Sequence, residues 1–190
     1  MGFNEKLAAA KEKGRPSRVV TVCLDADISA RLAVLEDERD DALHAERQDG
    51  RLAKKSRATE LNKQIEAVRA EFADALVDLK FTRLIGSAWL ELIAHNPPRP
   101  DNVADNGVFG YNFHAVTREA AEVSGVVVEG DEDRELSESE WDDLFGIISG
   151  GDHQRVADVI YALNEAESLR AVELGKALRA AARDSEKKSD

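Results

Sequence analysis

Apolar residues recur at alternating spacings of four and three along residues 61–76, the period with which one helix packs against another. A similar but weaker heptad pattern runs through residues 28–48. Gly50 lies between the two segments and favours a turn. The pattern predicts an antiparallel coiled-coil hairpin with arms about 30 Å long. Its seam is predicted to comprise Ile28, Leu32 and Leu35 on the first arm and Leu61, Ile65, Val68, Phe72 and Leu76 on the second.

The first arm of this hairpin has an incomplete seam. Arg39 stands where an apolar residue is expected, and Glu46 follows it. A turn centred on Asp49 and Gly50 would place the acidic Glu36 beside Lys63, a charge match that favours folding of the two arms on each other. The gap in the seam would leave part of the second arm's apolar stripe for a client or for another copy of the chain.

Short alternating segments flank the hairpin on both sides. Residues 18–24, "RVVTVCL", are rich in β-branched side chains, and "DLKFTRL" at 78–84 alternates apolar with polar residues. Pairing of 18–24 with about 77–84 would satisfy backbone groups that a lone strand leaves open. We therefore expect a strand, hairpin, strand unit at 18–86, after a flexible leader at 1–17.

The second half of the chain predicts helices separated by loops. Ser87 and Asn112 are placed as helix N-caps, and Ser137 with Glu140 has the spacing of a capping box. The acidic residues 129–135 are typical of a solvated linker. The predicted fold class is mainly α (α+β): an antiparallel helical coiled-coil hairpin on a small two-stranded base, followed by a C-terminal helical domain. That domain is expected at 87–182, with a charged tail at 183–190.

Composition narrows the choice of partners. The chain has 190 residues and a formal net charge of −12, which argues against nucleic acid because phosphate binding requires a Lys- and Arg-rich surface. No segment approaches the ~20 apolar residues that a membrane helix needs. We expect neither a nucleic acid nor a membrane partner.

Few residues in the sequence suggest a catalytic or metal-binding site. The histidines are scattered without a metal-binding spacing, and two acidic loops lack the ligand order of a twelve-residue calcium loop. The single cysteine, Cys23, lies on a presumed strand, and no serine occupies a nucleophile elbow. We expect no catalytic residues, no cofactor and no metal, and the sequence argues against an enzyme.

Residues 95–112, "HNPPRPDNVADNGVFGYN", interrupt the helical pattern with three prolines. The prolines end the preceding helix, so the segment reads as a corner between two helices. Its aromatic residues can either pack beneath the corner or meet a partner, and both readings stay open. The candidate partner-binding residues are Leu61, Ile65, Val68 and Phe72 on the hairpin and Phe109, Tyr111 and Phe113 around the corner.

The order of these parts resembles the tail assembly chaperones of long-tailed actinobacterial phages. The matching parts are a "VTVCL" strand, a charged helical hairpin, a "DLKFTRL" strand, a tryptophan helix ending in His-Asn-Pro-Pro, and an acidic segment leading to "LSESEW" and "ALN". The likeness covers roughly residues 18–165 and departs from the family where Asn96 separates His95 from Pro97. The family offers no catalytic residues to transfer.

The resemblance implies a chaperone in the cytoplasm of the host bacterium. Such a protein binds the aggregation-prone tape measure protein while tail-tube subunits assemble around it, and is absent from the finished virion. The tape measure protein is thus the expected partner, together with the tail-tube protein, and a homo-oligomer is compatible with the hairpin. Two alternatives stay open: a structural virion component such as a connector or tail-completion protein, and an acidic coiled-coil adaptor that binds a basic partner.

Overall fold

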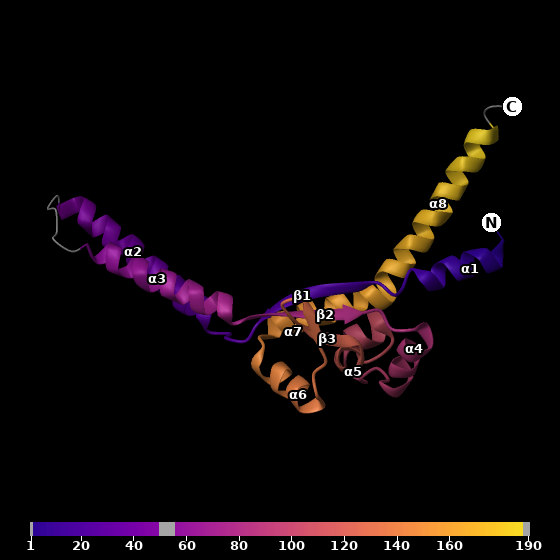
Figure 1. Cartoon of the computed structure of the whole chain (residues 1–190), viewed down its shortest axis with the longest axis horizontal. Coiled ribbons are helices and arrows are strands. Elements are labelled where there is room, and N and C mark those ends of the chain that lie inside the picture. Colours follow the sequence, from indigo (N-terminus) through magenta and orange to yellow (C-terminus); the bar gives the residue numbers. More distant parts are fainter. Residues whose placement is uncertain (1, 50–55, 188–190) are drawn as a thin grey trace.

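The computed structural model describes residues 2–49 and 56–187 and shows a mainly helical protein with one small antiparallel sheet (Figure 1). A central body carries two projections that point away from each other: helices α2 and α3 on one side, and α8 on the other. In chain order the elements are α1 (Phe3–Glu12), β1 (Ser17–Cys23), α2 (Ile28–Asp49), α3 (Arg57–Asp74), β2 (Leu76–Thr82), α4 (Gly86–His95), η1 (Asp105–Phe109), α5 (Phe113–Ser124), β3 (Gly125–Glu129), β4 (Glu132–Arg134), α6 (Glu138–Ile147), α7 (Gly150–Tyr161), η2 (Ala162–Ala166) and α8 (Glu167–Lys187).

The sheet has four antiparallel strands in the order β1-β2-β3-β4. The predicted pairing of the first two strands is confirmed, with Val20 opposite Leu79. The expected two-stranded base is too small, however, because β3 and β4 extend it. The stretch predicted as a solvated linker is instead the end of β3, a turn at Gly130 with φ of 66°, and the edge strand β4.

One face of the sheet is covered by helices and forms the core of the body. Val22, Leu79 and Phe81 are fully buried on that face, because alternate side chains of a strand point to the same side. They share one apolar cluster with residues of α5, α6 and α7. The sheet and the C-terminal helices therefore pack as one unit, which we call the body (β1 to β4 with α4 to α7).

Gly125 lies where β3 begins, at the point where strand and helix approach most closely. A Cβ atom there would lie 2.6 Å from the carbonyl oxygen of Ala121, 2.7 Å from the Phe81 ring and 2.8 Å from the Trp141 ring. Any side chain at this position would push the strand away from the core. The glycine thus allows β2, β3 and α6 to share one layer of packing.

Helix ends in the body follow local sequence signals, with one exception. The capping box of Ser137 and Glu140 at the start of α6 is confirmed, as is the Asn112 cap of α5. The predicted Ser87 cap is wrong: the N-cap of α4 is Ile85, two residues earlier, and it supplies no side-chain hydrogen bond. Apolar residues of α4, such as Trp89, pack in the core of the body, so packing rather than capping stabilises the start of this helix.

Helices α2 and α3 lie side by side in opposite directions, and we call this pair the arm (Figure 1). The charge pairing across it differs from the predicted register: Glu36 pairs with Arg69 at 2.9 Å, not with Lys63, and Arg31 pairs with Glu71 at 2.7 Å. The predicted turn residue Gly50 lies outside the described residues. The pairing is offset from the predicted one because α2 ends at Asp49 and α3 begins only at Arg57.

The two ends of the described chain are helical. The segment predicted as a flexible leader contains α1, none of whose residues is buried. The last helix continues from α7 through the π-helical turn η2 into α8, which reaches Lys187 and so includes part of the predicted charged tail. Figure 1 shows α8 leaving the body as a single extended helix.

Candidate partner-binding site

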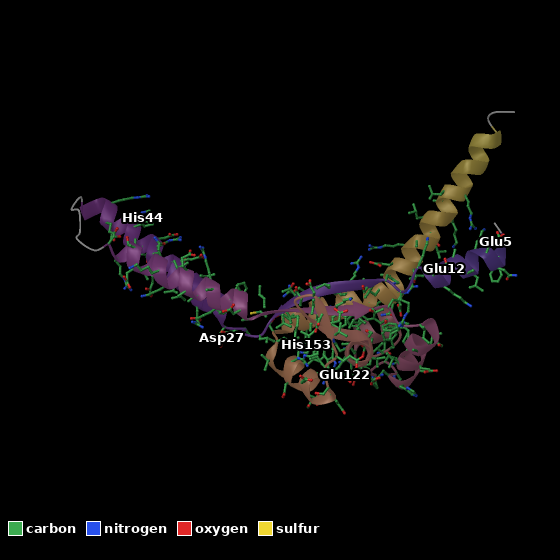
Figure 2. All side chains as sticks on the ribbon, viewed as in Figure 1. Glu5, Glu12, Asp27, His44, Glu122 and His153 are labelled. Atoms are coloured by element: carbon green, nitrogen blue, oxygen red, sulfur yellow. The ribbon has the colours of Figure 1, made fainter. Side chains whose placement is uncertain are left out.

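The described residues contain no group of three or more His, Cys, Asp or Glu side chains that could hold a metal ion. Figure 2 shows why the histidines do not combine: His44 lies far out on the arm, whereas His153 lies in the body. His153 contacts the carbonyl oxygen of Phe145 through Nε2 at 2.7 Å. The Cys23 thiol donates to the carbonyl oxygen of Asp25 at 3.2 Å.

The candidate residues on the arm mostly form its interior. Leu61 and Ile65 are each 1% exposed between the two helices, and Phe72 is half-buried. A partner cannot reach Leu61 or Ile65 while the arm is closed. Val68, which is 7% exposed, differs from these because it also lines a groove on the surface of the arm.

Of the two polar residues at the predicted gap in the first arm's seam, Arg39 pairs with the adjacent Asp40, whereas Glu46 bonds to the start of α3. Glu46 accepts hydrogen bonds from the Ser56 hydroxyl at 2.8 Å and from the backbone N–H of Ala58 at 3.3 Å, at the N-terminus of α3. The Ser56 hydrogen bond lowers the pKa of the Glu46 carboxyl. Glu46 therefore anchors the far end of the arm, and Ala58 and Leu61 beside it are buried.

The three candidate aromatic residues of the corner pack beneath it. Tyr111 and Phe113 are 2% and 5% exposed, and the half-buried Phe109 stacks on Phe113 with ring centroids 4.2 Å apart. The Tyr111 hydroxyl donates to Glu165 at 3.1 Å, and the Trp89 indole N–H donates to the same carboxylate at 3.0 Å. Burial raises the pKa of Tyr111. Of the two open readings, the structure shows packing.

The corner itself is closed by an ion pair. Asp105 is 1% exposed and accepts two hydrogen bonds from the Arg99 guanidinium, at 2.6 and 3.0 Å, and one from the Arg99 backbone N–H at 3.2 Å. The Arg99 side chain lowers the pKa of the Asp105 carboxyl to about 2. Asn102 and Asn106 bond to neighbouring backbone, so the polar residues of this segment serve its own geometry.

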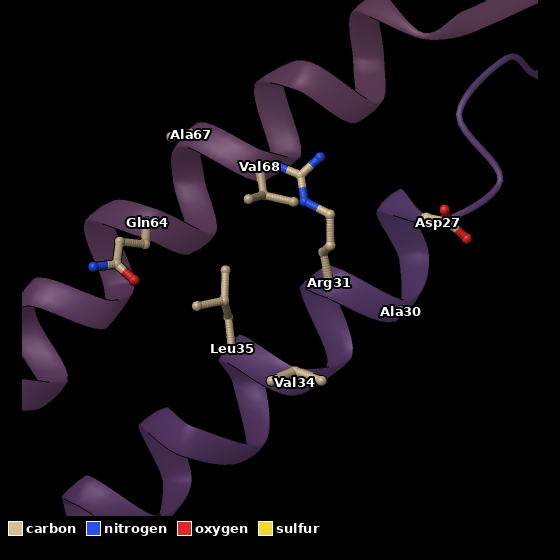
Figure 3. Close-up of a pocket in the computed structure, with 8 residues that line it drawn as sticks. All are labelled: Asp27, Ala30, Arg31, Val34, Leu35, Gln64, Ala67 and Val68. Atoms are coloured by element: carbon tan, nitrogen blue, oxygen red, sulfur yellow. The ribbon is translucent and has the colours of Figure 1, made fainter.

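The accessible apolar surface of the arm is a groove between α2 and α3 with a volume of about 690 Å³ (Figure 3). Leu35 and Val68 form its floor, and Val34, with 58% of its side chain exposed, forms part of its α2 wall. The side chains of Ala30 and Ala67 are short, so a helix could approach the groove closely. The groove is lined by Asp27, Ala30, Arg31, Val34, Leu35, Gln64, Ala67 and Val68.

Charged residues frame this groove at both ends. Arg31 pairs with Glu71 near the body, and Arg57 pairs with Glu38 at 3.3 Å farther out. The α2 helix as a whole carries seven carboxylates against three arginines, and Arg31 is its one charged residue among those that line the groove. The arrangement suits a ligand with an apolar stripe and basic flanks.

A second accessible apolar surface lies on α8. Between Ser168 and Arg179 every residue is exposed except Gly175, which is half-buried. The large apolar residues there are Leu169, Val172, Leu174 and Leu178, each more than half exposed. Exposed apolar side chains that recur along a free helix mark a surface for helix pairing.

Of these two accessible surfaces, sequence reasoning identified only Val68 in the groove and nothing on α8. The groove residues Ala30, Val34 and Ala67 lie beside the seam rather than on it, so a heptad pattern alone ranks them as solvent positions. The sequence does contain a signal for the groove: these three apolar residues stand beside the seam, at positions where charged residues are expected. On α8, Leu174 and Leu178 four residues apart give the corresponding signal.

Three comparisons with known proteins gave no relative. No protein-family model matches the chain, and no curated protein and no solved structure matches it. Among the described residues no helix is both long enough and apolar enough to cross a membrane.

Proposed function

We propose that the protein is a non-enzymatic tail assembly chaperone of a long-tailed phage, with the tape measure protein as its client. The observation that carries the proposal is the open apolar groove on the arm, which presents Val34 and Ala67 to solvent above the buried seam. In this proposal the arm is an antiparallel coiled-coil hairpin, and its groove takes one helix of the client.

The chemistry of the groove supports a helical client. A helix in a groove is recognised through apolar residues at spacings of three and four, and small residues on the receiving side let the two backbones approach. Ala30 and Ala67 supply these small positions on opposite walls. The receiving pair of helices and the bound helix would together bury apolar surface that a free coiled-coil segment exposes to water.

The charge of the chain supports a holding role. A formal net charge of −12 disfavours association between complexes and keeps a protein with exposed apolar surface in solution. A tape measure protein held in this way would stay available until tail-tube subunits assemble along it. The chaperone would act in the host cytoplasm and would be released before the virion is complete.

The direct test is co-expression of the chain with the tape measure protein of its phage, followed by measurement of the soluble, co-purifying fraction. We expect Val34→Asp to reduce co-purification by roughly 10-fold, because a charge would be buried against the client without a partner. Ala33→Asp is the matched control, since Ala33 is exposed on α2 but does not line the groove. Equal co-purification by both variants would reject the groove as the client site.

A second measurement separates the chaperone from a structural virion protein. Mass spectrometry of purified particles should find the tape measure protein but no stoichiometric amount of this chain. Stoichiometric presence in the particle would replace the proposal with a connector or tail-completion role.

A further inference from the structure

The molecule presents two helix-pairing surfaces at opposite ends. One is the groove between α2 and α3, and the other is the exposed length of α8 (Figure 1). The body separates them, and Figure 1 shows the arm and α8 pointing away from each other. A single molecule therefore cannot bring its own α8 into its own groove.

The exposed part of α8 has the composition of a ligand for this groove. Leu174 and Leu178, 62% and 63% exposed, lie four residues apart and so share one face of the helix. Ala171 precedes them at the adjacent turn, and Gly175 lies between them. Large side chains on α8 thus match the low walls that Ala30 and Ala67 give the groove.

Charge complementarity points in the same direction. Between Ser168 and Arg179 the α8 helix carries three cations, Arg170, Lys176 and Arg179, against the single carboxylate Glu173. Helix α2, with seven carboxylates and three arginines, has the opposite balance. Asp27, which lines the groove just before α2 begins, forms no ion pair in the part of the chain that the structure describes. Opposite charges favour docking of α8 on α2 and oppose pairing of two arms with each other.

The lengths of the two surfaces also agree. The groove runs along residues 27–35, and the exposed apolar residues of α8 run from Leu169 to Leu178, so each surface is about 12–14 Å long. We propose that α8 of one copy lies in the α2/α3 groove of a second copy, so that molecules join head to tail. The contact joins two different surfaces, so it produces an open chain or a closed ring, of which a reciprocal dimer is the smallest.

This contact has a consequence for the client. A helix of the client and α8 of a neighbouring copy would compete for the same groove, so client binding would shorten the assembly. The proposed self-association involves only the groove and α8 of this chain. It does not depend on which client the groove binds.

The test uses two variants of the full chain, each with one surface removed. Leu174→Asp with Leu178→Asp removes the α8 surface, and Val34→Asp removes the groove surface; all three positions are exposed, so the core is untouched. Sedimentation velocity of the wild type should show a mass that rises with concentration above 20.8 kDa. Each variant alone should associate roughly 30-fold more weakly, the effect of losing a central interface side chain.

Mixing the two variants gives the most specific result. The intact groove of one and the intact α8 of the other allow a single contact, so the mixture should form a heterodimer of twice 20.8 kDa and nothing larger. Raising the salt to ~1 M should weaken that heterodimer, because the flanking charges are exposed. Leu90→Asp, an exposed leucine on α4, is the control variant and should associate as the wild type does.

Three results would overturn the proposal. The first is a wild type that stays at 20.8 kDa at every concentration at which it remains soluble. The second is association of the α8 variant as strong as that of the wild type, which would place the contact elsewhere. The third is a mixture of the two variants that stays monomeric while the wild type assembles, which would show that the two surfaces do not meet.

Discussion

The body and the arm are stabilised in different ways, although both are built from amphipathic helices. The body buries twenty apolar residues in one cluster that joins a sheet to helices on one of its faces. The arm buries a single row, comprising Ile28, Ala58, Leu61, Ile65 and Val68. Each side chain in the cluster of the body packs against neighbours on several sides. Each side chain in the row of the arm packs only against its neighbours along the two helices.

The comparison explains where binding surface can exist. A residue next to the core of the body is covered by another element, as the corner covers Tyr111. A residue next to the seam of the arm, such as Val34, has nothing above it. A two-helix arm therefore leaves apolar residues uncovered directly beside its buried row, whereas exposed apolar residues of the body, such as Leu90 and Ile147, lie on the outer faces of its helices.

The largest expected effect comes from opening the cluster of the body. Trp141 is 1% exposed, and its ring lies 6.3 Å from that of Phe81 and 5.7 Å from that of Phe145, centroid to centroid. Trp141→Ala should lower the free energy of unfolding by about 3–5 kcal/mol, through lost burial and the cavity left behind. Denaturant unfolding followed by Trp89 fluorescence measures this change.

The control for that experiment lies on the same helix. Ile147 is 54% exposed, so Ile147→Ala should change the unfolding free energy by no more than about 0.5 kcal/mol. If Trp141→Ala were equally mild, the aromatic cluster would not be the stabilising centre of the body.

A smaller and more local effect is expected in the arm. Replacing Ile65 and Phe72 together by Asp places two charges in the seam, where no cation is positioned to pair with them. The 22 residues of α2 and the 18 of α3 should lose their helicity, about a fifth of the chain, while the body keeps its unfolding transition. Far-ultraviolet circular dichroism reports the first effect and Trp89 fluorescence the second.

The matched control adds the same charges outside the seam. Ala33→Asp with Ala70→Asp changes one exposed residue on each helix and should leave the helicity as in the wild type. Unchanged helicity in the Ile65 and Phe72 variant would show that the seam does not hold the arm together. A collapse of the body in the same variant would show that the two regions unfold as one.

Much of the helical layout could be predicted because its signals are local. The pairing of β1 with β2 and the capping box at Ser137 were predicted from short sequence patterns, whereas Leu76, predicted for the seam of the arm, lies in β2 and is 40% exposed. The strand β3 was missed because Val126 to Val128 show no alternation, and β4 because its charges are those of a solvated loop. Hydrogen bonds to β2, which is distant in sequence, make β3 a strand, and β4 becomes a strand by pairing with β3.

The candidate site was harder to predict than the fold, for a physical reason. Apolar periodicity identifies residues that are buried, and Leu61 and Ile65 are buried indeed. A binding surface consists of apolar residues that the fold leaves uncovered, and this depends on what does not pack above them. Val34 and Leu178 are recognised only once the positions of the arm and α8 are known.

The smallest expected effect is a loss of thermal stability at low pH. It separates the contribution of Asp105 in the corner from that of exposed carboxylates. The pKa of Asp105 is lowered in the folded state from 3.8 to about 2, mainly by the Arg99 side chain. A lowered pKa stabilises the fold fully above the unfolded value, and the stabilisation is lost as the pH falls through the folded value. The midpoint of thermal unfolding should therefore decline between about pH 4 and pH 2.

Asp105→Asn should lower that midpoint at neutral pH and flatten the decline, whereas Asp101→Asn, an exposed neighbour, should follow the wild type. An equally steep decline in Asp105→Asn would assign the acid sensitivity to other carboxylates, and the corner would then contribute no more to the body than an exposed loop.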